Sequence, residues 1–206
     1  MMTATISASL DGITTLPVRH VATIKTYLQR QALPAFPRRP DPAGISLLRM
    51  TGKNEARYQS IFATLGKEWL WWSRMMLSAE AISSILDDQN VLAYAVQENG
   101  RDIGLMELDF REKGCEELAF LGLFKGCTGK GIGPWLMGEA LEIAFSHHAL
   151  DQIQVNTCTL DHPGALGFYR SCGFTPIRQA VEIVPDPRLS GLLALDAAPH
   201  IPIILD

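Results

Sequence analysis

Gly129, Gly131 and Gly133 recur at alternate positions in the segment of the sequence with the clearest capacity for chemistry. An apolar stretch precedes them and an amphipathic stretch follows, so we expect a loop between a strand and a helix. Glycine lets the backbone turn tightly and bring its N–H groups close to a ligand. Pro134 suits the first turn of the following helix, and the free amides at a helix N-terminus attract phosphate. The segment therefore predicts a phosphate or diphosphate site, to which Lys130 could add a positive charge.

Two common phosphate-binding motifs do not fit this loop. A P-loop requires Ser or Thr after Gly-Lys, but Gly131 follows Lys130. A dinucleotide fingerprint requires a third glycine where Pro134 stands. For this segment taken alone, a glycine-rich turn that binds nothing is the alternative.

A second segment, residues 161–174 (DHPGALGFYRSCGF), favours a ligand. It combines a helix start, a short helix with Tyr169 on its inner side, and a glycine stop at Gly173. Together with the earlier loop it resembles the GNAT superfamily of N-acetyltransferases. In that family Arg/Gln-Gly-x-Gly-x-Gly/Ala begins the coenzyme A loop, and Ala-x-x-Phe-Tyr-x-x-x-Gly-Phe ends the core. The resemblance covers roughly residues 91–177, with Thr128 where the family usually has Arg or Gln and His162 where it often has Asn.

The resemblance implies an N-acetyltransferase that moves an acetyl or other acyl group from acetyl-CoA to a primary amine of a small molecule or peptide, without a metal. It implies that the strand at 118–124 diverges from the strand at 152–158, and that the pantetheine arm lies in the gap. The diphosphate would then rest on the backbone amides of the loop. The cofactor-binding residues implied in this way are Leu121, Gly122, Leu123, Phe124, Thr128, Gly129, Lys130, Gly131, Ile132, Gly133, Pro134, His162 and Tyr169.

Acyl transfer to an amine also requires an acid and a base, because an alkylammonium has a pKa of about 10 and must lose a proton before it attacks. The motif position makes Tyr169 the expected acid, although a tyrosine on a short helix could simply pack in the core. Glu117 is the first candidate for the base and Glu107 the second, with a solvated strand edge as the alternative for both. His162 is a further candidate because histidine exchanges protons near neutral pH. A helix cap is the alternative role for His162 or Asp161.

Trp69, Trp71 and Trp72 fall in the segment that the resemblance places over the acceptor cleft. They could line a pocket for an apolar or aromatic amine. Core packing is the preferred explanation, because buried tryptophan is usually structural. No acidic run indicates a polyamine or histone-tail site, so the sequence leaves the acceptor open.

The elements expected around these residues give an α+β, layered fold, with a mixed central sheet flanked by helices. Strands are predicted at residues 20–29, 44–50, 91–98, 102–110, 116–124, 152–158 and 173–184, and helices at 54–74, from 78, at 133–147 and at 163–172. The three strands from 91 to 124 are expected to be antiparallel neighbours, with a turn at Asn99-Gly100.

Three regions are predicted along the chain. Residues 1–43 form an N-terminal extension with a loose leader over 1–17, a strand, and a proline-rich connector that cannot be helical. Residues 44–184 form the GNAT-like domain, and residues 185–206 a tail that could add a strand. The extension and the tail could each mediate a homodimer or cover a sheet edge.

Composition limits the partners. A chain of 206 residues, 47% of them hydrophobic, can bury a full core. The net charge of −4 without a basic run argues against nucleic acid and membrane surfaces as partners. The absence of a signal-like start and of CxxC pairs predicts a cytoplasmic protein without a metal cage.

Two other functions stay open at this point. Because Thr128 replaces the usual Arg or Gln, the chain could instead be a catalytically degenerate regulatory module that binds acyl-CoA but does not catalyse acyl transfer. An unrelated phosphate-binding α/β protein is the weaker alternative.

Overall fold

The computed structural model describes residues 11–33, 35–37, 39–148 and 150–205. One mixed sheet of seven strands has the order β2-β3-β4-β5-β6-β1-β7. The strands are β1 (His20–Gln31), β2 (Ile45–Met50), β3 (Val91–Glu98), β4 (Arg101–Asp109), β5 (Glu117–Leu123), β6 (Gln152–Cys158) and β7 (Thr175–Pro185). The helices are α1 (Glu55–Trp69), α2 (Ala79–Leu86), α3 (Ile132–His148) and α4 (Ala165–Ser171), with short 3-10 segments η1 (Gly52–Asn54) and η2 (Ser73–Met76).

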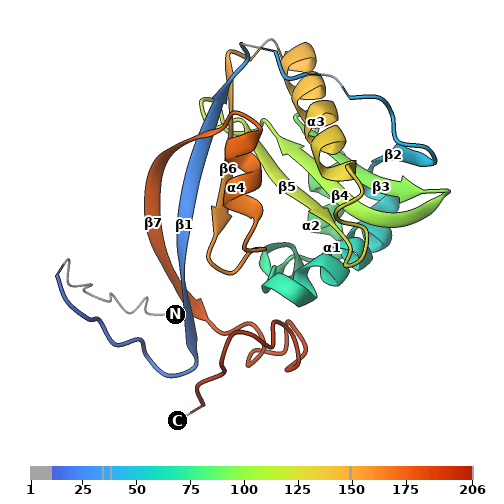
Figure 1. Cartoon of the computed structure of the whole chain (residues 1–206). Helices are drawn as coiled ribbons and strands as arrows, with labels where there is room; N and C mark the ends of the chain where they lie inside the picture. The colour runs from blue at the N-terminus through green and yellow to red at the C-terminus, as the bar shows by residue number, and fades with distance from the viewer. Residues whose placement is uncertain (1–10, 34, 38, 149, 206) are drawn as a thin grey trace.

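The helices cover the two faces of the sheet, which confirms the predicted fold class (Figure 1). On one face, α3 and α4 bury a cluster that includes Leu136, Met137 and Tyr169. On the other face, α1 and α2 bury a second cluster around Phe62 and Leu105. Alternate residues of the central strands supply both clusters, because successive side chains of a strand point to opposite faces.

The predicted meander is confirmed, since β3 pairs antiparallel with β4 and β4 antiparallel with β5. Asn99 and Gly100 join the first two strands with φ angles of 51° and 79°. Both angles are left-handed, as the favoured hairpin turns require.

The first helix ends five residues before the predicted boundary at Arg74. Leu70 takes a left-handed φ of 52°, and the Trp71 N–H donates to the carbonyl of Gly66 at 3.2 Å. This turn ends the helix, so Trp71 and Trp72 lie outside it. The start of α2 agrees with prediction, because the Ser78 hydroxyl accepts a hydrogen bond from the Ala81 N–H.

The strand expected in the N-terminal extension, β1, is an internal strand of the sheet. It lies between β6 and β7 and pairs antiparallel with both. Leu28 of β1 is fully buried in the hydrophobic cluster under α3 and α4. The first ten residues of the predicted leader lie outside the described residues.

The C-terminal tail does not add a strand over its described residues, 186–205. Arg188 and Asp186 form a buried ion pair there, with side chains 1% and 2% exposed. The Arg188 guanidinium also donates to the carbonyls of Ala197 and Ile201. These bonds fold the tail into turns, which replaces the expected strand.

None of the described helices is both long and apolar enough to cross a membrane. The described residues also contain no group of three or more His, Cys, Asp or Glu side chains arranged to hold a metal ion.

Candidate functional site

The sheet opens between β5 and β6. These two strands run parallel and pair at one position, Glu117 with Gln154. Beyond it they diverge, while β5 stays paired with β4 as far as Leu123. The predicted divergence is confirmed. The backbone groups of Leu121–Leu123 that point toward β6 face an opening, although such groups usually find a hydrogen-bond partner.

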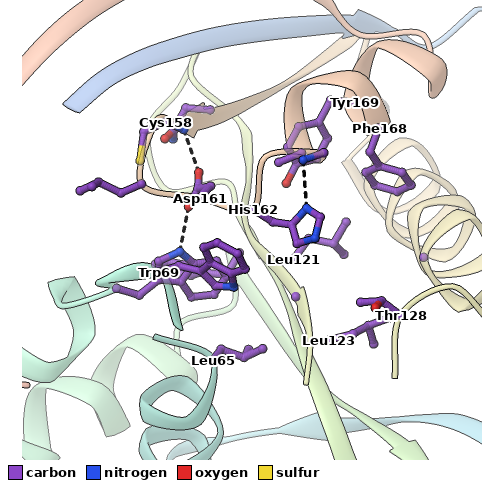
Figure 2. A pocket seen from close by; sticks show the side chains of 18 of the residues that line it. Leu65, Trp69, Leu121, Leu123, Thr128, Cys158, Asp161, His162, Phe168 and Tyr169 are labelled. Carbon is purple, nitrogen blue, oxygen red and sulfur yellow. Dashed lines mark hydrogen bonds between the residues drawn. The ribbon is translucent and has the colours of Figure 1, made fainter. Parts of the chain in front are cut away.

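A cavity of about 820 Å³ occupies this opening. Leu65 lines it from α1, and Phe168 and Tyr169 line it from α4 (Figure 2). Trp71, which follows α1, lines it as well. Because residues from both faces of the sheet contribute, the cavity passes through the gap between β5 and β6. Its volume is in the range of cofactor and substrate sites, about 300–1,000 Å³.

The glycine loop closes one end of the cavity. Its lining residues include Thr128, Gly129, Gly131, Gly133 and Pro134. Gly129 and Gly131 both have a φ of 79°, and a Cβ at either position would meet no atom within 4 Å. The loop therefore presents open backbone next to the N-terminus of α3, which begins at Ile132. This geometry fits a diphosphate.

Three residues of the predicted binding set do not line the cavity. Lys130 points to Glu98, with 3.6 Å between the Lys130 Nζ and the Glu98 Oε1. Ile132 is 2% exposed and packs in the core. Phe124 packs against the cluster under α1. The remaining residues of the predicted set, among them Leu121, Gly122, Leu123 and His162, are lining residues.

Tyr169 lies in the wall of the cavity and is 8% exposed. The rings of Phe168 and Phe174 contact it, with centroids at 5.6 Å and 6.0 Å. Burial raises the pKa of the phenol, and the electrostatic effects of Asp161 and Cys172 add to this shift. It therefore stays protonated throughout the neutral range and can donate a hydrogen bond.

Glu117 lies at the point where β5 and β6 begin to diverge. Burial raises the pKa of its carboxyl group, and the charge of Asp109 on β4 adds to the effect. Glu117 does not line the cavity itself, but its hydrogen-bond partner Asn156 does. A buried carboxylate with a raised pKa is suited to accept a proton near neutral pH.

Glu107 has a structural role. It is fully buried, its Oε2 accepts from the Tyr58 hydroxyl, and its Oε1 accepts from the Arg74 guanidinium. Glu107 is not among the described lining residues of the cavity. One oxygen joins α1 to the sheet and the other joins η2 to it, so Glu107 is unsuited to the role of second candidate base.

The family model described as the acetyltransferase (GNAT) family matches residues 58–174, more than half of the chain. The chain belongs to the GNAT acetyltransferase family. The matched segment contains the gap, the glycine loop and Tyr169. Comparison with curated protein sequences gave no significant match.

Solved structures support the GNAT fold. A functionally unknown conserved protein from Staphylococcus epidermidis aligns with a TM-score of 0.61 at 13% identity, over 81% of this chain and 63% of that chain. A GCN5-related N-acetyltransferase from Sphaerobacter thermophilus aligns with a TM-score of 0.59 at 16% identity, over 79% and 51%. An aminoglycoside acetyltransferase from an uncultured soil metagenomic sample aligns with a TM-score of 0.54 at 17% identity, over 68% and 93%. This GNAT chain spans less than two-thirds of the length of the first two structures.

Asp161 is a site residue of this GNAT domain for which the sequence suggested only a helix cap. Its carboxylate accepts from the Trp71 indole N–H at 2.9 Å, and from the Thr157 hydroxyl and the Cys158 amide, each at 2.8 Å. It thereby joins the segment after α1 to the loop after β6 (Figure 2). The cap of α4 is Gly164, and neither Asp161 nor His162 takes that role.

The ion pair of Lys25 and Glu182 also lines the cavity, with 3.0 Å between the Lys25 Nζ and the Glu182 Oε1. No local sequence pattern marks these two residues, because they meet only when β1 pairs with β7. His162 is exposed, and its Nδ1 accepts from the Gly164 N–H at 2.9 Å.

Proposed function

We propose that this chain is an acetyl-CoA-dependent N-acetyltransferase that acylates a primary amine. The observation that supports this proposal is the cavity through the gap between β5 and β6, with the glycine loop at one end and Tyr169 in its wall. An extended pantetheine arm suits such a gap, because it can complete the backbone pairing of β5 as an added strand does. The amides of the glycine loop suit the diphosphate.

In the proposed reaction the amine nitrogen attacks the carbonyl carbon of the thioester. A C–N bond forms, the C–S bond breaks, and the products are an amide and a thiol. Glu117 accepts the proton that the amine must lose, through a water held with Asn156. Its raised pKa brings the carboxylate closer to the basicity that this step needs.

Tyr169 acts on the leaving group in this proposal. Its phenol donates a hydrogen bond to the sulfur as negative charge develops there, and passes on the proton that the thiolate takes up. Because burial raises the pKa of the phenol, Tyr169 is protonated before every turnover.

The proposal is tested by thiol release from acetyl-CoA across a panel of primary amines, with thermal shift as a second readout. We expect acetyl-CoA, but not NAD or ATP, to raise the melting temperature, because a ligand of the native state stabilises it. We also expect amine-dependent release of thiol. Binding without turnover on any amine would favour a regulatory acyl-CoA-binding module. No response to acetyl-CoA in either assay would contradict the proposal.

A further inference from the structure

The chain around the end of α1 places three tryptophans in the wall of the cavity. Leu70 is left-handed, and Gly66 makes the turn possible, because a Cβ there would lie 2.6 Å from the Trp71 carbonyl oxygen. Trp69 before this turn, and Trp71 and Trp72 after it, all line the cavity, and each is partly exposed.

Two of these tryptophans have structural partners. Trp71 packs between Phe62 and Phe120, with ring centroids at 5.7 Å and 5.6 Å, and donates its indole N–H to Asp161. Trp72 packs against the small cluster that joins Leu70 to the C-terminal tail. Core packing, the explanation preferred from the sequence, therefore accounts for both residues.

Trp69 is different. Among the described residues it belongs to none of the three buried clusters. Its ring meets two imidazoles edge-on, His162 of the loop after β6 at 5.3 Å and His200 of the tail at 5.7 Å. Figure 2 shows Trp69 and His162 projecting into the cavity from different elements. Core packing does not explain a large aromatic ring held in this way at the cavity wall.

The charged side chains of the cavity wall already have partners within the wall and the residues around it. Lys25 and Glu182 pair with each other. Asp161, the other carboxylate among the described lining residues, accepts from three donors. A polycationic acceptor requires several carboxylates without a partner, because each buried ammonium must be paired. This wall favours an acceptor with a large apolar surface and little charge.

We propose that the acceptor is an apolar or aromatic monoamine whose hydrocarbon or ring stacks on Trp69, between His162 and His200. This inference rests on the proposed function and specifies its substrate class. Trp69 is the specificity-determining residue, because stacking on an indole selects planar and apolar bodies. The amine then points away from Trp69, toward the gap and Tyr169.

The test compares kcat/KM for tryptamine and hexylamine with that for spermidine and the aminoglycoside sisomicin, at saturating acetyl-CoA. We expect tryptamine and hexylamine to be better by at least about tenfold. Trp69→Ala should raise the KM for tryptamine by about tenfold or more and change kcat by less than about threefold. Trp69→Phe keeps an aromatic face and should retain most of the affinity.

Met76→Ala is the matched control, because Met76 is 63% exposed, lies in η2 close to Trp69 in sequence, and does not line the cavity. It should leave the kinetics unchanged. All variants should show the same thermal shift with acetyl-CoA as the unmodified chain, which separates loss of acceptor affinity from loss of folding.

Calorimetry with tryptamine, on the protein alone and saturated with coenzyme A, gives a readout that does not depend on turnover. Weaker binding in Trp69→Ala supports the inference even if no amine is acetylated, in which case the proposed function fails separately. Preferred turnover of spermidine or sisomicin overturns the inference and leaves the acetyltransferase intact. Equal tryptamine binding by Trp69→Ala and the unmodified chain also overturns it.

Discussion

Burial acts on the two central side chains in ways that suit different tasks. It raises the pKa of both Tyr169 and Glu117. For the phenol the result is a group that is always protonated, and for the carboxyl group it is a stronger base. One physical cause therefore prepares both the acid and the base of the proposed reaction.

Replacing Tyr169 with Phe removes one hydroxyl and keeps the ring between Phe168 and Phe174. We expect kcat to fall by about 10²–10³-fold, because a positioned proton donor contributes on this order. The KM for acetyl-CoA should stay within about threefold, since the ring still packs. Steady-state thiol release measures both constants, and a variant with at least half of the original kcat would exclude Tyr169 as the acid.

Replacing Glu117 with Gln should lower the rate at neutral pH by about 10²-fold and change the pH profile. In the unmodified chain the rate rises as pH increases through the raised pKa of Glu117, and then levels off. Without this base only the neutral amine reacts, so the rate should keep rising by about tenfold per pH unit toward pH 10.

Glu116→Gln is the control for this profile, because the same change is made one residue earlier, where the Glu116 Oε1 accepts from the Gly114 N–H. The rate of the Glu116→Gln variant should still level off at high pH, as in the unmodified chain. A plateau in Glu117→Gln as well would show that another group accepts the proton.

At this scale the sequence located the motif segments, but it did not show that Lys130 and Ile132 of the glycine loop lie outside the cavity wall. The position of Tyr169 follows from the short helix and its glycine stop. Glu107 could not be separated from Glu117, because its partners Tyr58 and Arg74 lie far from it along the chain. The ring of Trp69 contacts His200 of the tail, and no spacing rule connects these two positions.

At the scale of elements, the function depends on two strands that separate. The sequence predicted β6 at its observed bounds and β5 within one residue, because both have clear strand patterns. It could not predict the early end of α1, since leucine is seldom left-handed and gives no stop signal.

Hydrogen exchange tests whether the edge of β5 receives a ligand. We expect acetyl-CoA to slow exchange of the amides of residues 121–123 that face β6, and of the glycine loop, because the ligand supplies the missing partners. The amides of β2–β3, on the far side of the sheet, should not change. Protection confined to other elements would place the ligand elsewhere.

At the scale of the molecule, segments near both ends of the sequence reach the site. β1 occupies the position between β6 and β7, and the tail carries His200 to Trp69. A sequence pattern shows that residues 20–31 form a strand, but not which strands they join, because the partners lie more than 120 positions later.

The buried pair of Arg188 and Asp186 fixes the tail, so Arg188→Ala should destabilise the chain. We expect a loss of about 3–5 kcal/mol, because the change leaves a buried carboxylate unpaired. Thermal unfolding measures this loss, with a melting temperature lower by about 10 °C. Arg101→Ala, at an exposed arginine, is the control.

The same pair predicts a pH dependence. Burial alone would raise the pKa of Asp186, but the bonds from Arg188 outweigh it and hold the pKa below its usual value. The pair therefore stabilises the fold above about pH 4 and loses this contribution as pH falls through the lowered pKa. Arg188→Ala should lose this acid-dependent component, and an unchanged acid profile would contradict the role of the pair.

A crystal structure with acetyl-CoA tests the central claim most directly. We predict that the diphosphate contacts the amides of Gly129–Gly133, that the pantetheine arm lies between β5 and β6, and that the thioester sulfur is within hydrogen-bond distance of the Tyr169 hydroxyl. A complex in which β5 and β6 close on each other, or in which the ligand binds outside this cavity, would contradict the account.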